Sequence, residues 1–294
     1  MPLTVVEGRR LTLSNLEKVL YPRAGFTKGE ALHYYARVAG ALLPHLQGRP
    51  LSFVRYPDGV EGQRFFAKQI PPGTPEWVRT CEVRHSDGST SQRVMIQDLA
   101  SLIWAANLAA LELHTPQWLA GAQAQADRLV LDLDPGAPAT LVDCCAVAVW
   151  LRERLAEDGL RCHAKTSGAK GLHLLVPLRP TPSRTVSDYA RSLARRAERA
   201  LPDLALHQMA RRLRAGRVFI DHSQNSQAKT TAAPYTLRAQ PTPTVSTPVT
   251  WEEVESCQDP EELTFTAGDL PGRLERYGDL LGPLLNASRA SSLP

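Results

Sequence analysis

One short segment, RLVLDLDPG at residues 128–136, constrains the fold of this chain more than any other. Its apolar and polar residues alternate as in a strand, and Pro135-Gly136 ends the alternation. Asp132 and Asp134 are two residues apart, so both carboxylates leave the same face of the strand while the leucine between them faces a core. The chain is therefore expected to form a sheet that carries two acids at the end of one strand.

A third acid, Asp221, ends a second apolar strand, GRVFID at residues 216–221. Like charges at one sheet edge repel each other unless a cation lies between them, and oxygen ligands suit Mg²⁺ or Mn²⁺. Three carboxylates can hold two ions, one to activate an attacking hydroxyl and one to steady a leaving phosphate. Asp132, Asp134 and Asp221 are therefore candidate metal ligands and catalytic residues. A D-x-D pair by itself can also be a strand end that turns into solvent.

The segment KTSGAKGLHLLV at residues 165–176 combines residue types that bind phosphate. Its glycines let backbone amides approach an anion, and Ser167, Lys170 and His173 add side-chain donors. We expect His173 to open a strand and to face the same edge as the acids, with the loop before it holding a triphosphate. The spacing is not that of a Walker A motif, and an ordinary hairpin with a polar turn is the alternative.

Basic residues concentrate in the second half of the chain, although its net charge is only +4. Nine arginines lie between Arg184 and Arg217 against three acids, which suits a phosphate backbone. A solvated helix face is the alternative explanation. The loop that follows Asp221 adds two cations and two neutral donors: Lys229, Arg238, Gln224 and Asn225.

Composition indicates a protein with a substantial core and a reducing environment. The 294 residues are 43% hydrophobic, no apolar run of signal-peptide length follows the charges at the start, and no stretch approaches the length of a membrane span. The five cysteines are odd in number and contain no C-x-x-C pair, which argues against a zinc site and a disulfide framework. We expect a cytoplasmic, nucleoid-associated protein without a membrane partner.

The periodicity predicts helices and strands in mixed order, and hence an α/β or α+β fold. Helices are expected at 28–46 with Thr27 as N-cap, at 93–113, 140–158, 185–201 and 271–285, with a capping box opening another at 250–253. Further strands are expected at 51–56, 162–165 and 171–178, and an extended, proline-containing connector at 240–249. We interpret residues 1–294 as a single domain with an N-terminal lobe (1–90), a catalytic core (91–240) and a C-terminal extension (241–294).

The order of these motifs resembles that of the archaeo-eukaryotic primase superfamily, which has D-x-D, then S-x-x-x-x-x-H, then a lone aspartate at a strand end. More closely, the chain resembles the polymerase domain of bacterial ligase D, from non-homologous end joining. The matching stretches span nearly the whole chain: residues 11–22, 48–69, 111–116, 129–135, 166–173 and 219–239. The resemblance implies a primase-like core with a mostly antiparallel sheet flanked by helices, plus an N-terminal lobe.

The resemblance also implies roles for individual residues. It assigns two catalytic ions, Mn²⁺ in preference to Mg²⁺, to the three aspartates. Phe65 and Phe66 would stack on a base, for which core packing is the alternative. The site for the nucleoside triphosphate, NTP or dNTP, would comprise Lys68, His114, Ser167, Lys170, His173, Lys229 and Arg238. The pocket for the 5′-phosphate at a DNA break would comprise Asn15, Lys18 and Lys28.

The activity that the resemblance implies is template-directed nucleotidyl transfer that fills short gaps and extends ends, with ribonucleotides preferred. A 3′-hydroxyl would attack the α-phosphate in line and release pyrophosphate. The expected partners are DNA with gaps, overhangs or double-strand breaks, together with Ku and a DNA ligase. A primase that starts chains de novo, a non-catalytic DNA-end binding module and a metal-dependent phosphoesterase are the alternatives. Because most relatives are fused to ligase and phosphoesterase domains, the chain is expected to be an excised domain or a stand-alone enzyme.

Overall fold

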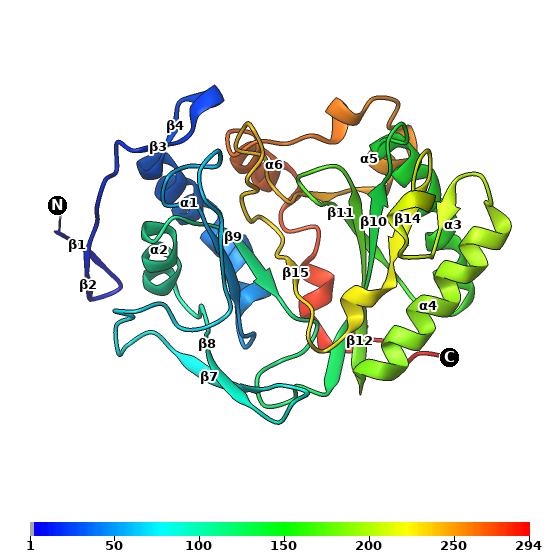
Figure 1. Ribbon diagram of the computed structural model, residues 1–294, viewed down its shortest axis with the longest axis horizontal. Coiled ribbons are helices and arrows are strands. Elements are labelled where there is room, and N and C mark those ends of the chain that lie inside the picture. Colours follow the sequence, from blue (N-terminus) through cyan, green and yellow to red (C-terminus); the bar gives the residue numbers. More distant parts are fainter. Residues whose placement is uncertain (1–2) are drawn as a thin grey trace. The chain divides into compact units, whose positions relative to one another are not determined.

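The computed structural model describes residues 3–294, which form two compact units (Figure 1). The first unit comprises residues 3–116, Thr230–Ser246 and Phe265–Gly278, and the second comprises Gln117–Lys229, Thr247–Thr264 and Asp279–Pro294. The chain thus passes between the units several times. The division into an N-terminal lobe, a catalytic core and a C-terminal extension, with boundaries at residues 90 and 240, stays a prediction.

The first unit contains a four-stranded antiparallel sheet with two main helices. The strand order is β15-β9-β5-β6, with β15 at Thr231–Ala232, β9 at Ala110–Thr115, β5 at Ser52–Arg55 and β6 at Phe65–Ala67. The helices are α1 (Lys28–Leu46) and α2 (Leu99–Asn107), with the short α6 (Leu270–Tyr277) against α1. Three two-stranded hairpins complete it: β1 (Leu3–Val6) with β2 (Arg9–Thr12), β3 (Val19–Tyr21) with β4 (Phe26–Thr27), and β7 (Thr80–Arg84) with β8 (Thr90–Val94).

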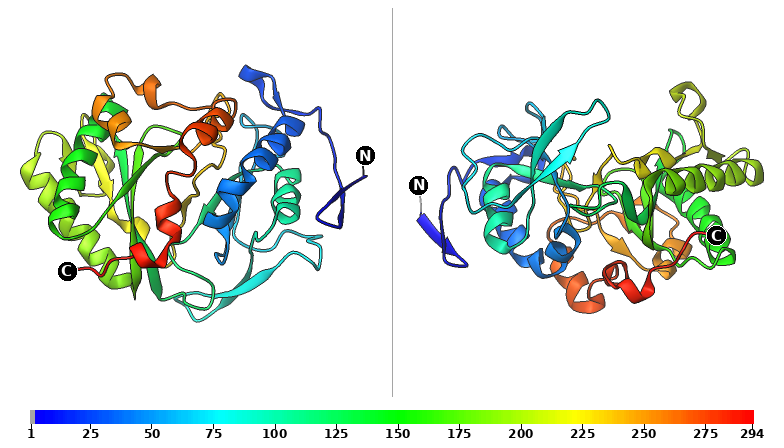
Figure 2. Two further views of the ribbon diagram at one scale, coloured as in Figure 1. Left: turned by 180° about the vertical axis from the view of Figure 1, so that it is seen from behind. Right: turned by 90° about the horizontal axis from the view of Figure 1, so that it is seen from below.

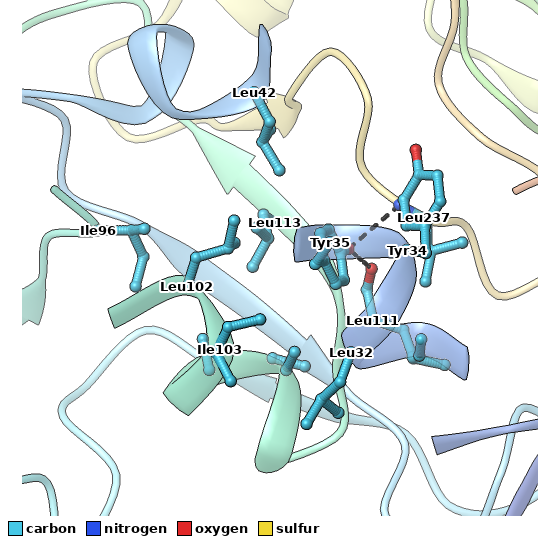
Figure 3. Packing of buried hydrophobic residues seen from close by; sticks show 14 of the residues in the cluster. Leu32, Tyr34, Tyr35, Leu42, Ile96, Leu102, Ile103, Leu111, Leu113 and Leu237 are labelled. Atoms are coloured by element: carbon cyan, nitrogen blue, oxygen red, sulfur yellow. Dashed lines mark hydrogen bonds between the residues drawn. The ribbon is translucent and has the colours of Figure 1, made fainter. Parts of the chain in front are cut away.

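Helix α1 begins and ends where the sequence predicts. Thr27 Oγ1 accepts from the backbone N–H of Glu30, and the Glu30 carboxylate accepts from the N–H of Thr27, which closes a capping box. The apolar face of α1 lies in the core that Figure 3 shows. There the Tyr35 hydroxyl donates to the Leu111 carbonyl and accepts from the Leu237 N–H, so the helix is tied to two other segments of the unit.

The long helix expected at 93–113 is wrong, because the segment forms a strand end, a short helix and another strand. Asp98 Oδ1 accepts from the Ser101 N–H at 2.9 Å, and this cap starts α2 four residues after β8 has ended. Ala109 has a φ of 54°, in the left-handed region that interrupts a right-handed helix. The chain then continues as β9, whose pairing with β5 satisfies its backbone groups.

The second unit is built on a six-stranded sheet in the order β13-β14-β10-β12-β11-β16. All neighbouring strands are antiparallel except β13 and β14, so the expected mixed fold with a mostly antiparallel sheet is confirmed. The strands are β10 (Gln125–Pro135), β11 (His163–Thr166), β12 (Leu172–Pro182), β13 (Ala205–Leu206), β14 (Val218–Asp221) and β16 (Pro248–Val249).

Two helices and two 3₁₀ turns cover the faces of this sheet. Helices α3 (Leu141–Glu157) and α4 (Ser183–Ala200) both contact β10 and β12 and each other. The turns η5 (Gly282–Leu285) and η6 (Ala287–Arg289) contact β12, and Figure 2 shows them in red, in front of the strands when seen from behind. Val130 and Leu175 pack with Leu281 and Leu284 beneath η5.

The C-terminal elements agree with the sequence only in part. The expected capping box is present, and Thr250 opens α5 (Trp251–Ser256). The helix expected at 271–285 is wrong in its second half, because α6 ends at Tyr277 and is followed by Gly278, whose φ is 63°. Residues after it form η5 instead. Among the helices of residues 3–294, none is both long and apolar enough to cross a membrane.

Candidate active site

The strand register of the second unit places two predicted site residues directly beside Asp132. On β10, Asp132 faces His173 of β12 on one side and Asp221 of β14 on the other. His173 in turn faces Lys165 of β11. Residues directly opposite each other in antiparallel strands leave the same face with their Cβ atoms about 5 Å apart. Lys165, His173, Asp132 and Asp221 therefore form one polar row across the sheet, and Asp134 lies two residues further along β10.

Side-chain contacts hold the carboxylates of this row. His173 Nε2 lies 3.3 Å from Asp132 Oδ1, with the histidine buried and the aspartate partly exposed. Asp221 Oδ1 accepts from the Ser223 hydroxyl at 2.6 Å and from the Ser223 N–H at 2.9 Å, while Oδ2 accepts from Gln224 Nε2 at 2.9 Å. Hydrogen bonds of this kind fix the orientation of a carboxylate that serves as a metal ligand.

Asp134 makes an ion pair that sequence reasoning did not assign. Arg214 Nη1 lies 3.2 Å from Asp134 Oδ2, and its guanidinium stacks 3.8 Å from the centre of the Phe219 ring. Burial and the neighbouring charge of Asp132 raise the pKa of Asp134, and Arg214 and Lys170 oppose that rise. Mutual repulsion between the acids is the electrostatic condition that a bound cation would relieve.

The donor set suits divalent ions, although the present side-chain orientations do not form a closed ligand cluster. Within residues 3–294, no three histidine, cysteine or acidic side chains are arranged to hold a metal ion. Asp221 is turned toward Ser223 and Gln224, and Asp134 toward Arg214. The three aspartates nonetheless supply hard oxygen donors from adjacent register positions on one face, which fits Mn²⁺ or Mg²⁺.

The loop between β11 and β12 is closed by its own serine. Ser167 Oγ accepts from the N–H groups of Ala169 and Gly171, both at 3.1 Å, and the Ser167 N–H donates to the Gly171 carbonyl. A Cβ at Gly171 would lie 2.0 Å from the Leu133 carbonyl oxygen, so only glycine allows the loop to lie against the strand of the two aspartates. Lys170 is exposed at the tip of this loop.

Asn225 has a different role from the one the sequence suggested. We expected a neutral donor for a phosphate, but the side chain is 1% exposed and bound to backbone. The side-chain amide of Asn225 forms hydrogen bonds with both the N–H and the carbonyl of Val130, each at 2.8 Å. It also donates to the His222 carbonyl at 3.0 Å. The expectation is wrong because β14 ends at Asp221, opposite Asp132. The backbone groups of β10 next to this end, at Val130, therefore need another hydrogen-bond partner, which Asn225 supplies.

In the first unit, Glu112 organises two of the predicted nucleotide-binding residues. His114 Nε2 lies 2.8 Å from Glu112 Oε2, and Arg238 Nε lies 3.2 Å from Oε1, which also accepts from the Ala239 N–H. Burial alone would raise the pKa of Glu112, but these hydrogen bonds and the charges of Arg238 and His114 hold it at about 2. Glu112 was not predicted from the sequence, where its signal is a single acid between Leu111 and Leu113 in a strand.

Phe66 and Lys68 lie beside His114. The rings of Phe66 and His114 meet edge to face at 6.4 Å, and Lys68 Nζ lies 5.6 Å from the centre of the Phe66 ring. Phe65 is adjacent on the strand and points to the opposite face. The two rings are 41% and 44% exposed, so neither is packed in the core.

The three residues predicted to bind a 5′-phosphate lie together at the start of α1. Asn15 adopts a φ of 53°, its carbonyl accepts from the Lys18 N–H, and the Lys18 carbonyl accepts from the Lys28 N–H. Lys18 Nζ forms an ion pair with Asp58 at 2.7 Å. Lys28 Nζ donates to the Ser14 carbonyl at 2.6 Å, and burial, with the charge of Lys18, lowers the pKa of Lys28 to about 8.

The structure therefore sorts the predicted residues into three groups. The second unit holds the aspartates, Ser167, Lys170, His173 and the exposed Lys229. The first unit holds Phe65, Phe66, Lys68, His114 and Arg238 around its sheet, with Asn15, Lys18 and Lys28 at the start of α1.

The family model described as "LigD, primase-polymerase domain" matches residues 27–281. This chain belongs to that family. The sequence-based prediction of a nucleotidyltransferase of this family is thereby confirmed, and membership implies divalent metal ions without specifying which.

Curated relatives are longer proteins of bacterial end joining. The chain is 43% identical over 278 residues to the multifunctional non-homologous end joining protein LigD of Mycolicibacterium smegmatis, covering 94% of this chain and 36% of that protein. It is 28% identical over 271 residues to the bifunctional LigD of Bacillus subtilis, covering 92% of this chain and 43% of that protein. The chain thus spans well under half the length of these relatives.

A solved structure agrees with the fold. The polymerase domain of Mycobacterium tuberculosis ligase D, in complex with DNA, superposes with a TM-score of 0.88 at 42% sequence identity. The match covers 94% of this chain and 98% of that one. The expected primase-polymerase fold is therefore confirmed over almost the whole chain.

Proposed function

We propose that this LigD-family chain is a template-directed, DNA-dependent polymerase that fills short gaps and extends ends in non-homologous end joining, preferring ribonucleotides. The observation that supports it most is the register of β10, which sets Asp132 between Asp221 and His173 on one sheet face. A phosphate-binding type of loop lies against the same strand. Polymerase activity in the relatives' family adds weight to the proposal.

The residues of the chain have separate tasks in this reaction. Asp132, Asp134 and Asp221 would hold Mn²⁺ or Mg²⁺, two ions in all, which when bound neutralise phosphate charge and activate a hydroxyl. Ser167, Lys170, His173 and Lys229 would hold the triphosphate of the nucleotide, because they supply hydroxyl, ammonium and imidazole donors. His173 lies next to Asp132 and is suited to orient that carboxylate.

The first unit would contact the base and the DNA end. Glu112 keeps Arg238 and His114 in fixed positions beside Phe66 and Lys68, a group that offers an exposed ring and cations to a nucleotide. Asn15, Lys18 and Lys28 would bind the 5′-phosphate of a break, supported by two ammonium groups at the N-terminus of α1. Phe65 remains proposed as the second stacking residue.

The proposed setting is the bacterial cytoplasm at the nucleoid, with DNA gaps, overhangs and double-strand breaks as substrates. Ku and a DNA ligase are the proposed protein partners. The names of the relatives, which are end joining proteins of bacteria, support both proposals.

Primer extension on a short, 5′-phosphorylated gap tests the function. We expect templated addition in Mn²⁺ or Mg²⁺, with NTPs used in preference to dNTPs. Absence of extension in either metal, with gap binding intact, would favour an end-binding module. Dinucleotide synthesis on a single strand without a primer would favour a primase instead.

A further inference from the structure

Helix α4 carries a stripe of arginines that the proposed reaction does not use. Arg184, Arg191, Arg195 and Arg199 recur at positions i, i+7, i+11 and i+15, which lie on one side of a helix. Two hollows of about 400 and 510 Å³ follow one another along this side. The opposite wall comes from residues between His207 and Gln227, so α4 and this segment enclose an arginine groove within the second unit.

Most of the positive charge of the arginine groove is not balanced by carboxylates. Arg191, Arg195, Arg199 and Arg217 form no ion pair with any residue from 3 to 294. The acid of the second hollow, Glu198, is bound to His207 and Gln208 instead. Asp188, the acid of the first hollow, approaches Arg184 at 4.0 Å, whereas Arg196, on another side of α4, pairs with Asp158 at 3.5 Å. Several guanidiniums gathered in a concave surface attract a polyanion.

The residues of the arginine groove indicate how such a polyanion would be contacted. Within the described part of the chain, neither hollow is lined by phenylalanine, tyrosine or tryptophan. The aromatic rings present are the imidazoles of His222, which is buried, and of His207, which is held by Glu198, so bases would find no large aromatic platform. Guanidinium groups and hydroxyls bind phosphate oxygens without reading sequence. From Arg184 to Arg199 the helix rises about 22 Å, the length of ~6 nucleotides stacked as in one strand of a duplex.

One end of the arginine groove reaches the acidic row. Ser223 lines the first hollow, and its hydroxyl donates to Asp221 Oδ1 at 2.6 Å. We propose that the groove binds the sugar–phosphate backbone of a single DNA strand whose end is presented to the aspartates. This rests on the proposed function, because it takes the aspartates to be the polymerase centre.

Two matched double variants test the groove by binding alone, without metal or nucleotide. Arg191→Gln with Arg195→Gln removes two groove charges, and Arg161→Gln with Arg289→Gln removes two exposed, unpaired charges elsewhere in the second unit. Affinity is measured by fluorescence anisotropy at several salt concentrations, for DNA with a 2-nucleotide or an 8-nucleotide single-stranded overhang.

For the long overhang, the groove variant is expected to lower the slope of log affinity against log salt by about 1.4, since each phosphate contact contributes ~0.7. The control variant and the charge-preserving Arg191→Lys with Arg195→Lys should keep the wild-type slope. Equal slopes in groove variant and wild type, or an equal loss on both overhangs, would overturn the proposal. Wild-type primer extension is scored separately, so that failure of the polymerase function is distinguished from failure of the groove.

Discussion

Asn225 replaces a missing strand beside Val130. Its Oδ1 accepts from the Val130 N–H and its Nδ2 donates to the Val130 carbonyl, each at 2.8 Å, just where β14 has ended. The same amide donates to the carbonyl of His222, the residue after Asp221. One buried side chain therefore connects the strand that carries Asp132 to the turn that carries Asp221.

Replacing Asn225 by alanine should destabilise the chain and weaken metal binding together. Two buried backbone groups of Val130 would lose their partners, at a cost of about 2–4 kcal/mol in the free energy of unfolding. We also expect the half-saturating Mn²⁺ concentration for extension to rise several-fold, because the turn that follows Asp221 loses its hydrogen bonds to β10 and the Asp221 carboxylate is less well oriented. Urea unfolding and a Mn²⁺ titration measure the two effects. The exposed Asn286→Ala serves as the control; a wild-type Mn²⁺ requirement in Asn225→Ala would show that the residue is structural only.

Asp132→Ala or Asp134→Ala should abolish extension while DNA binding stays measurable. Loss of a metal ligand removes several kcal/mol of charge stabilisation, which corresponds to a rate at least about 100-fold lower. Extension on the phosphorylated gap and gel-shift binding of the same DNA are the two measurements. Asp203→Asn, at an exposed position of the same unit, should keep its rate. Near-normal polymerisation by either alanine variant would refute the assignment of the ligands.

Recognition of a 5′-phosphate should depend on pH through Lys28. The pKa of Lys28 is about 8, so its charge is present below that pH and lost above it. The phosphate becomes a dianion above pH ~6, and the preference for phosphate over hydroxyl should therefore peak near neutral pH. The ratio of the two dissociation constants for gapped DNA, measured from pH 5.5 to 9.5 at one salt concentration, gives this profile.

The variant Lys28→Met should reduce the phosphate preference about tenfold and remove its decline above pH 8. Equal affinities of wild type for phosphorylated and unphosphorylated gaps would contradict the pocket. Stability changes in the other direction: because the folded pKa lies below the ordinary 10.5, the unfolded chain binds more protons between pH 8 and 10.5. The contribution of Lys28 to stability therefore rises with pH in that window.

Acid should unfold the first unit partly through Glu112. Its folded pKa of about 2 lies below the ordinary value of 4.5, so the unfolded chain binds the extra proton between these limits. The stabilisation is complete above pH 4.5 and is lost as the pH falls toward 2. Glu112→Gln should lower stability at pH 7 and flatten its decline between pH 5 and 3, as followed by urea unfolding. The exposed Glu82→Gln should behave as wild type; an unchanged pH profile in Glu112→Gln would count against the ion pair with Arg238.

The sequence by itself determined the local features of this protein. The caps at Thr27 and Thr250, the strand of Asp132 and Asp134 and their common face all depend on residues within a few positions of each other. The motif order also indicated the family, because it is read along the chain. The helix expected at 93–113 was wrong over its last residues, because an apolar run of this kind is compatible with either a helix or a buried strand. Pairing with β5 makes these residues the strand β9.

Only the tertiary structure decided which distant residues meet. Asp221 lies beside Asp132 because β14 pairs with β10. Asn225 bonds Val130 because that pairing ends at Asp132 and leaves the backbone groups of Val130 without a strand partner on this side. Glu112 became the partner of Arg238 although 126 positions separate them in the sequence. Spacing along one strand fixes the face of a side chain, whereas its neighbours across the sheet depend on register, and register is set by the packing of the whole unit.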